Sequence, residues 1–191
     1  MKAKILRAGR AAAVANAAEG VQGTGGLLRR VIWAGPVVFL VHDLEELVTI
    51  EDWTRLHGDR LPEAFRLLLP VSTAEFGVAM TALLLVFMAA AWLADRARLE
   101  GGRAVDFFVF LVAILGTNAL GHVAQAVLFG AYVPGLLTAV LLVLPYAYWG
   151  LATVTRSGIR SVRWAVSAVA VAAVVQGPVA ALALVLGKSF V

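Results

Sequence analysis

The chain lacks cysteine and is poor in charge. Its 191 residues include no Cys, and only 15% are Asp, Glu, Lys or Arg, whereas about 25% are charged in an ordinary soluble domain. Disulfides, thiolate metal ligands and a cysteine nucleophile are therefore excluded. Hydrophobic residues make up 61% of the chain, and the mean hydropathy is +0.89. This composition excludes a cytosolic enzyme and predicts an all-α integral membrane protein.

Long uncharged runs indicate where the chain crosses the membrane. A spanning helix needs about 20 apolar residues, and we expect five spans: 107–130, 133–155 and 164–187, which are uncharged, 71–94, which contains Glu75, and 31–50, which contains three acids. Pro134 and Gly135 predict the turn between the third and fourth segments. We therefore expect a bundle of about five transmembrane helices in residues 31–191. Residues 1–30 form a basic, flexible or surface-lying N-terminal arm in this interpretation.

The distribution of the basic residues predicts the orientation. Lys and Arg number 16 against 12 Asp and Glu, and most of them fall in segments 1–30, 95–106 and 156–163. Because such residues collect on the cytoplasmic side, we expect a cytoplasmic N-terminus and an outer C-terminus in a multi-pass protein of the cell membrane. The excess of basic residues is therefore explained by the topology. The chain has no surface of interleaved basic and aromatic residues, so we expect no nucleic-acid partner.

The first expected span contains an acidic motif, His42-Asp43-Leu44-Glu45-Glu46. Its uncharged part, 31–41, is too short to cross about 30 Å of hydrocarbon at about 1.5 Å per residue. Either the acids lie within the membrane or the helix stops at its surface, where they would join Glu51 and Asp52. In a helix, His42, Glu45 and Glu46 share one face, with Asp43 to one side.

Polar residues of the other spans lie at a similar depth. In the third span, Asn118 and His122 are four residues apart on one face. A rise of about 1.5 Å per residue places the polar residues of all five spans about 16–24 Å above the inner boundary. These residues are His42, Glu45, Glu46, Glu75, Asn118, His122, Thr138 and Gln176. No Lys or Arg falls at this level, so metal ions, shared protons, the histidines or water would have to compensate the acids.

Carboxylates and imidazoles together are ligands that iron, zinc and manganese accept. We therefore expect His42, Glu45, Glu46 and His122 to hold one or two divalent metal ions. Four residues are expected to have catalytic roles: Glu46, Glu75, Asn118 and Tyr132. Glu46 or Glu75 would bridge the metal ions or act as a general base. Asn118 would hold the metal ligands in place, and the Tyr132 side chain would cover the site. In the alternative interpretation, His122 is a neutral histidine bonded to a backbone carbonyl and Glu75 is merely interfacial.

The motif H-x-x-E-E at 42–46, the later His122 and the Y-x-P-G sequence at 132–135 occur in this order on expected membrane helices. In this the chain resembles the HXXEE family, bacterial membrane proteins of unknown function named for the motif. The resemblance covers about residues 31–155. It implies a shared site built from His42, Glu45, Glu46, His122 and the 132–135 turn, and it implies no established reaction.

The leading hypothesis is a membrane-embedded, metal-dependent enzyme that acts on a lipid-like or isoprenoid-like substrate. With zinc the reaction would be hydrolysis, and with iron it would be oxidation. A second hypothesis is a small proton- or cation-coupled transporter that uses the same residues. A third is a metal-free acid catalyst that cyclises isoprenoids. The sequence does not choose between zinc and iron, and it leaves the oligomeric state open.

Overall fold

The fold consists of helices, and the described part of the chain holds no strand. A computed structural model describes residues 2–60, 63–66, 68–69, 71–97 and 102–191, and within the first helix it describes side chains from Gly25 onward. The elements are α1 (Lys2–His57), η1 (Gly58–Arg60), α2 (Glu63–Arg66), α3 (Thr73–Arg96), α4 (Arg103–Phe129), α5 (Leu136–Thr138), η2 (Ala139–Val143), α6 (Leu144–Arg156) and α7 (Val162–Phe190). The predicted all-α class is confirmed.

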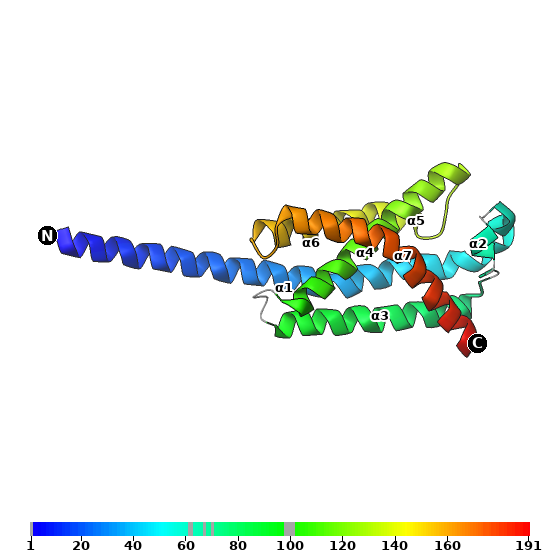
Figure 1. Cartoon of the computed structure of the whole chain (residues 1–191), viewed down its shortest axis with the longest axis horizontal. Coiled ribbons are helices and arrows are strands. Elements are labelled where there is room, and N and C mark those ends of the chain that lie inside the picture. The colour runs from blue at the N-terminus through cyan, green and yellow to red at the C-terminus, as the bar shows by residue number, and fades with distance from the viewer. Residues whose placement is uncertain (1, 61–62, 67, 70, 98–101) are drawn as a thin grey trace.

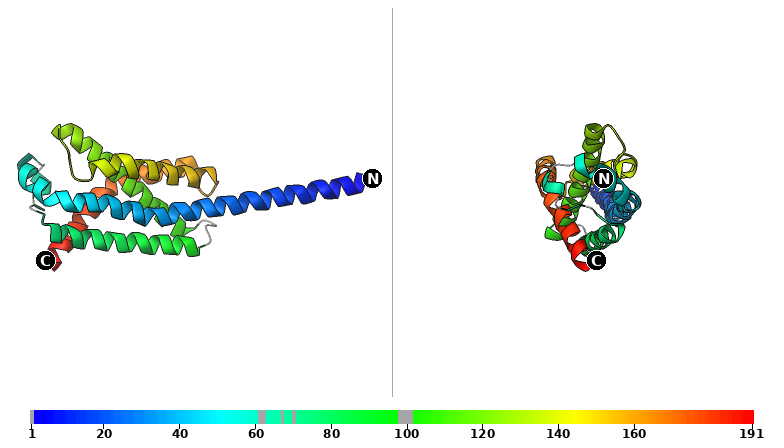
Figure 2. Two further views of the ribbon diagram at one scale, coloured as in Figure 1. Left: turned by 180° about the vertical axis from the view of Figure 1, so that it is seen from behind. Right: turned by 90° about the vertical axis from the view of Figure 1, so that its right-hand side faces the viewer.

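Four described helices are long and apolar enough to cross a membrane: α3, α4, the continuous stretch Leu136–Arg156, and α7. They coincide with four expected spans to within a few residues, so the chain is a multi-pass membrane protein. The remaining expected span, 31–50, forms part of α1, which carries the acidic motif and runs antiparallel beside α3 (Figures 1 and 2). That α1 also crosses the membrane, with its N-terminus in the cytoplasm, stays a prediction.

The N-terminal arm expected in residues 1–30 is helical from Lys2 onward. It continues without a break into the bundled part of α1 and projects beyond the other helices (Figure 1). The alanines at 11–13, 15, 17 and 18 favour a helix strongly enough to outweigh the glycines that follow, each of which costs about 1 kcal/mol relative to Ala. The division into an arm and a transmembrane domain stays a prediction.

The hydrophobic core fills the half of the bundle where α3 ends and α4 begins. There α1 packs against α3 and α6, and α4 packs against α6 and α7, which crosses the bundle at a slant (Figure 2). A Cβ atom on Gly35 would lie 2.6 Å from the Tyr146 hydroxyl, so α1 and α6 are in close contact. That hydroxyl donates to the carbonyl of Val31 (3.0 Å), which satisfies a polar group inside the apolar core.

The opposite half is polar, and an irregular segment shapes it. α4 ends at Phe129 and is capped by Gly130, and a turn then leads to α5 and to a π-helical stretch, η2. Pro145, which follows, has no N–H to donate to the carbonyl of Leu141, and its ring crowds that carbonyl. A wider helical turn relieves this conflict, and such π-segments frequently occur at functional sites. The segment presents Thr138 to the acidic motif of α1.

Candidate metal centre

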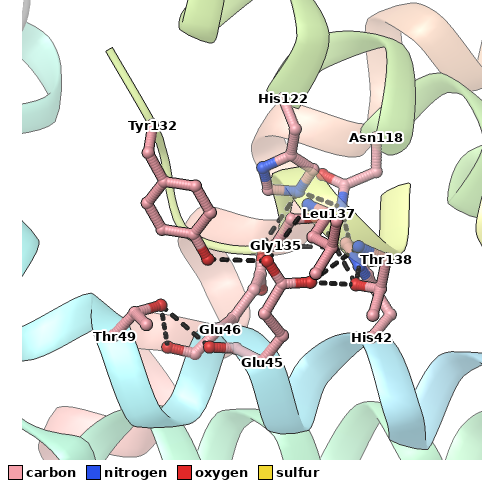
Figure 3. A network of polar contacts seen from close by, with 10 residues as sticks. All are labelled: His42, Glu45, Glu46, Thr49, Asn118, His122, Tyr132, Gly135, Leu137 and Thr138. Carbon is pink, nitrogen blue, oxygen red and sulfur yellow. Dashed lines mark hydrogen bonds and ion pairs between the residues drawn. The ribbon is translucent and has the colours of Figure 1, made fainter. Parts of the chain in front are cut away.

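Three side chains from two helices converge in the polar half of the bundle (Figure 3). His42 and Glu46 lie one turn apart on α1, and His122 comes from α4. One potential ligand atom from each lies within 4.8 Å of the others. Glu46 Oε1 is 2.8 Å from His122 Nε2 and 3.9 Å from His42 Nε2. His42 is fully buried and His122 is 7% exposed, so solvent barely reaches the two imidazoles.

Asn118 marks the point at which the two imidazoles converge. Its Nδ2 lies 2.9 Å from His122 Nε2 and 3.4 Å from His42 Nε2, and the two rings meet edge to face. Asn118 and His122 are four residues apart on α4, as the sequence spacing predicted. The amide therefore touches both histidines, one on its own helix and one on α1.

Thr138 orients His42. Its hydroxyl donates to Glu45 Oε2 (2.5 Å) and lies 2.8 Å from His42 Nδ1. Because the single hydroxyl proton is given to Glu45, the oxygen accepts from Nδ1–H of the imidazole. Neutral His42 then presents the Nε2 lone pair to Glu46 and His122. Fixing a histidine through its second ring nitrogen is how proteins orient metal ligands.

Glu45 faces the turn before α5 instead of the His42, Glu46 and His122 group. Its Oε1 accepts from the Tyr132 hydroxyl (2.6 Å) and the Leu137 N–H (3.1 Å), and its Oε2 accepts from the N–H and hydroxyl of Thr138. Four donors thus saturate both carboxylate oxygens. These bonds tie Glu45 to the turn and keep it apart from the His42, Glu46 and His122 group, and Tyr132, predicted as a cover, is one of the donors. The role of Glu45 as a metal ligand stays a prediction.

Gly135 lies directly against the acidic motif. Its φ is +77°, and a Cβ atom there would lie 2.8 Å from His42 Cε1 and 2.9 Å from Glu46 Oε1. A side chain at this position would therefore strain the backbone and displace two of the three converging residues. Trp53 further secures the turn by donating from Nε1 to the carbonyl of Tyr132 (3.0 Å).

Replacing Thr138 tests whether His42 is oriented as described. Thr138→Val keeps the shape of the side chain but removes the hydroxyl that joins Glu45 to His42. We expect the affinity for a divalent metal to fall about 10- to 100-fold, the usual effect of losing such a support. Thr155→Val is the matched control, because Thr155 bonds to carbonyls within its own helix. Competition with a fluorescent zinc indicator measures both affinities, and equal values would contradict the orienting role.

Glu75, predicted at the same depth as the histidines, is engaged at the start of α3. Its side chain accepts from the Ser72 N–H (2.8 Å), and its own N–H donates to Ser72 Oγ, which forms a capping box. It also pairs with Lys188 (3.3 Å) near the end of α7. From the sequence we expect no Lys or Arg at the level of these acids, and this is wrong for Glu75. α7 extends past Gly187, so Lys188 lies close enough to form an ion pair with Glu75.

A cavity of about 160 Å³, lined by residues of α1, α3, α4 and α7, adjoins the candidate metal centre. Most of its walls are apolar, but Glu46 and Asn118 line it as well as contacting the histidines. Asp43, placed to one side by the sequence analysis, is 6% exposed and also lines this cavity. The sequence indicated Asp43 only through its place in the motif. The cavity that it lines could not be predicted, because the other walls come from α3, α4 and α7.

The chain was compared with family models, curated proteins and solved structures. A family model described as "Protein of unknown function with HXXEE motif" matches residues 33–150. No curated protein and no solved structure matches. The match covers more than half of the chain and includes the motif residues His42, Glu45 and Glu46, His122 and the 132–135 turn. The chain therefore belongs to the HXXEE family.

Proposed function

We propose that the protein is a metal-dependent integral membrane enzyme that acts on a lipid-like substrate. The observation that carries the proposal is the convergence of His42, Glu46 and His122 beside an apolar cavity. These three residues would hold one divalent ion. Neither Lys nor Arg is among the residues that line the cavity, so a bound cation would balance the acids that face it.

The donor geometry fits a metal ion. Ligand atoms about 2.0–2.1 Å from a tetrahedral ion are separated by about 3.3 Å, and the distances of Glu46 Oε1 from the two Nε2 atoms, 2.8 and 3.9 Å, bracket this value. Two imidazoles and one carboxylate leave a fourth position open, which is typical of catalytic rather than structural zinc sites. The same set with open positions is found in non-haem iron enzymes.

When bound, zinc would supply an activated water for hydrolysis and iron would supply oxygen chemistry for oxidation. The protein's own residues perform the remaining tasks. Thr138 and Glu45 hold His42 in position, and Asn118 lies against both histidines. Glu46 belongs to both the proposed ligand group and the cavity wall, so it would hold an ion at the side of the cavity where a lipid would bind.

Turnover of lipids tests the enzymatic proposal. The purified protein in detergent, loaded with zinc or with iron under air, is incubated with a bacterial lipid extract, and the lipids are compared by mass spectrometry. We expect one lipid class to be depleted in favour of a hydrolysed or oxidised product, with no depletion by His122→Ala or after chelation. His57→Ala is the matched control, because His57 bonds within α1 and stacks on Trp53.

Two results would contradict the proposal. Lipids left unchanged with either metal would argue against an enzyme of this class. A product that forms equally in the presence of a chelator would instead support metal-free acid catalysis by the same carboxylates.

A further inference from the structure

The cavity beside the metal centre has the shape and chemistry of a ligand site. Apolar side chains line most of it, among them Phe76, Met80, Leu83, Leu111, Ile114 and Leu184. Its volume of about 160 Å³ is close to that of engineered apolar cavities that bind benzene. It therefore accommodates about six carbon atoms, which is the end of a lipid chain rather than a whole lipid.

One part of the cavity wall is polar, and acceptors outnumber donors there because Nδ2 of Asn118 is already in contact with the two histidines. Asp43 and Glu46 contribute carboxyl groups from α1, and Gln176 contributes its amide from α7. Gln176 Oε1 is buried and is the one buried side-chain atom among the described residues with no hydrogen-bond partner. A buried acceptor without a donor lowers the stability of the folded protein. A ligand that donates a hydrogen bond to this oxygen would remove that cost.

The acceptors also limit which polar group of a bound lipid fits in the cavity. A carboxylate or phosphate would meet Asp43 and Glu46, whose two charges already offset that of the proposed divalent ion, and no Lys or Arg lines the cavity to pair with it. An ammonium group would have to lose its hydration to enter a mainly apolar space, which is costly. A hydroxyl avoids both costs, because it is neutral and donates one hydrogen bond.

We propose that the cavity binds an aliphatic alcohol, with the hydroxyl donating to Gln176 Oε1 and the chain packed between α3 and α7. The inference rests on the proposed function, because Glu46 and Asn118, which touch the histidines, also line this cavity. It names the substrate class: lipids with an alcohol group, whose hydroxyl lies next to the metal centre. Gln176 is a specificity-determining residue for these lipids.

Photolabelling of the full-length protein in detergent tests this assignment. The probe is a medium-chain primary alcohol with a diazirine in its tail, and the labelled peptides are identified by mass spectrometry. We expect saturable labelling of α3 and α7 that excess unlabelled alcohol prevents. Gln176→Leu, which keeps the volume but removes the acceptor, should reduce the saturable labelling about three- to tenfold, the loss expected for one hydrogen bond.

Gln125→Leu on α4 is the matched control, since Gln125 does not line the cavity, and it should label like the unmodified protein. Ala183→Leu, which fills the cavity from α7, should abolish saturable labelling. Equal labelling of Gln176→Leu, equal labelling by the alkane analogue, or labelling only by the amine analogue would overturn the assignment.

Metal content measured on the same samples separates this inference from the proposed function. Saturable labelling without bound metal would refute the metal-dependent function but leave the alcohol site standing. Bound metal without saturable labelling would refute the alcohol site alone.

Discussion

Replacing Gly135 by alanine is expected to abolish metal binding and to destabilise the protein by about 3 kcal/mol. The left-handed backbone at φ +77° costs a residue with a Cβ atom about 1–2 kcal/mol. In addition, the methyl group would overlap His42 Cε1 and Glu46 Oε1, and overpacking of this kind typically costs about 1–3 kcal/mol. Because both neighbours must move, the proposed metal ligands would lose their alignment.

Gly130→Ala is the matched control for this substitution. Gly130 also has a positive φ, +62°, but a Cβ atom there would meet nothing within 4 Å. It therefore carries the backbone cost alone, about 1 kcal/mol, and should leave metal binding intact. Thermal unfolding in detergent and a metal titration measure both variants. If the two glycines behave alike, Gly135 serves only the turn and does not shape the metal centre.

The two glutamates of the motif are expected to respond oppositely to substitution by glutamine. Glu46→Gln removes a ligand, so metal affinity should fall at least about 100-fold, while the unfolding temperature of the metal-free protein changes little. Glu45→Gln places an amide NH₂ opposite donors that now bond to a carboxylate oxygen. Two hydrogen bonds are lost and donors face each other, at a cost of about 3 kcal/mol.

The comparison uses thermal unfolding without metal and a metal titration of each variant. Glu45→Gln should show the lower unfolding temperature and the smaller loss of metal affinity, since it disturbs His42 only through Thr138. If Glu45→Gln instead abolished metal binding without lowering the unfolding temperature, Glu45 would be a direct ligand and Glu46 would not hold the position proposed for it.

Much of the fold follows from the sequence, because charged residues bound the apolar runs and fix the ends of α3, α4 and α7 to within a few residues. Helical spacing also predicts the pairs His42–Glu46 and Asn118–His122, since residues four apart share a face. The rise per residue also predicted that Glu46 of α1 and His122 of α4 lie at the same depth in the membrane. The distance of 2.8 Å between Glu46 Oε1 and His122 Nε2 agrees with that prediction.

The remaining contacts depend on neighbours that spacing does not reveal. Glu45 lies on the same face as His42, but the position of the 132–135 turn decides that it anchors Tyr132 and Thr138. The pairing of Glu75 with Lys188 depends on how far α7 extends. The π-helical stretch depends on a single residue, Pro145, within an otherwise regular apolar run.

The end of α1 and the start of α3 share an interaction that acidity should weaken. Glu51 near the end of α1 accepts from the N–H (2.9 Å) and hydroxyl (2.7 Å) of Thr73 at the start of α3. These bonds hold the pKa of the Glu51 carboxyl below its ordinary value. The stabilisation is therefore complete above the ordinary pKa and is lost as the pH falls through the lowered one.

The metal content of the purified protein tests the central claim most directly. The full chain is purified in detergent without chelators or immobilised metal, and its metals are counted by inductively coupled plasma mass spectrometry alongside His122→Ala and His57→Ala. We predict about one zinc or iron per chain in the unmodified protein and in His57→Ala, and almost none in His122→Ala. No bound metal in the unmodified protein, even after incubation with zinc and with iron, would contradict the account.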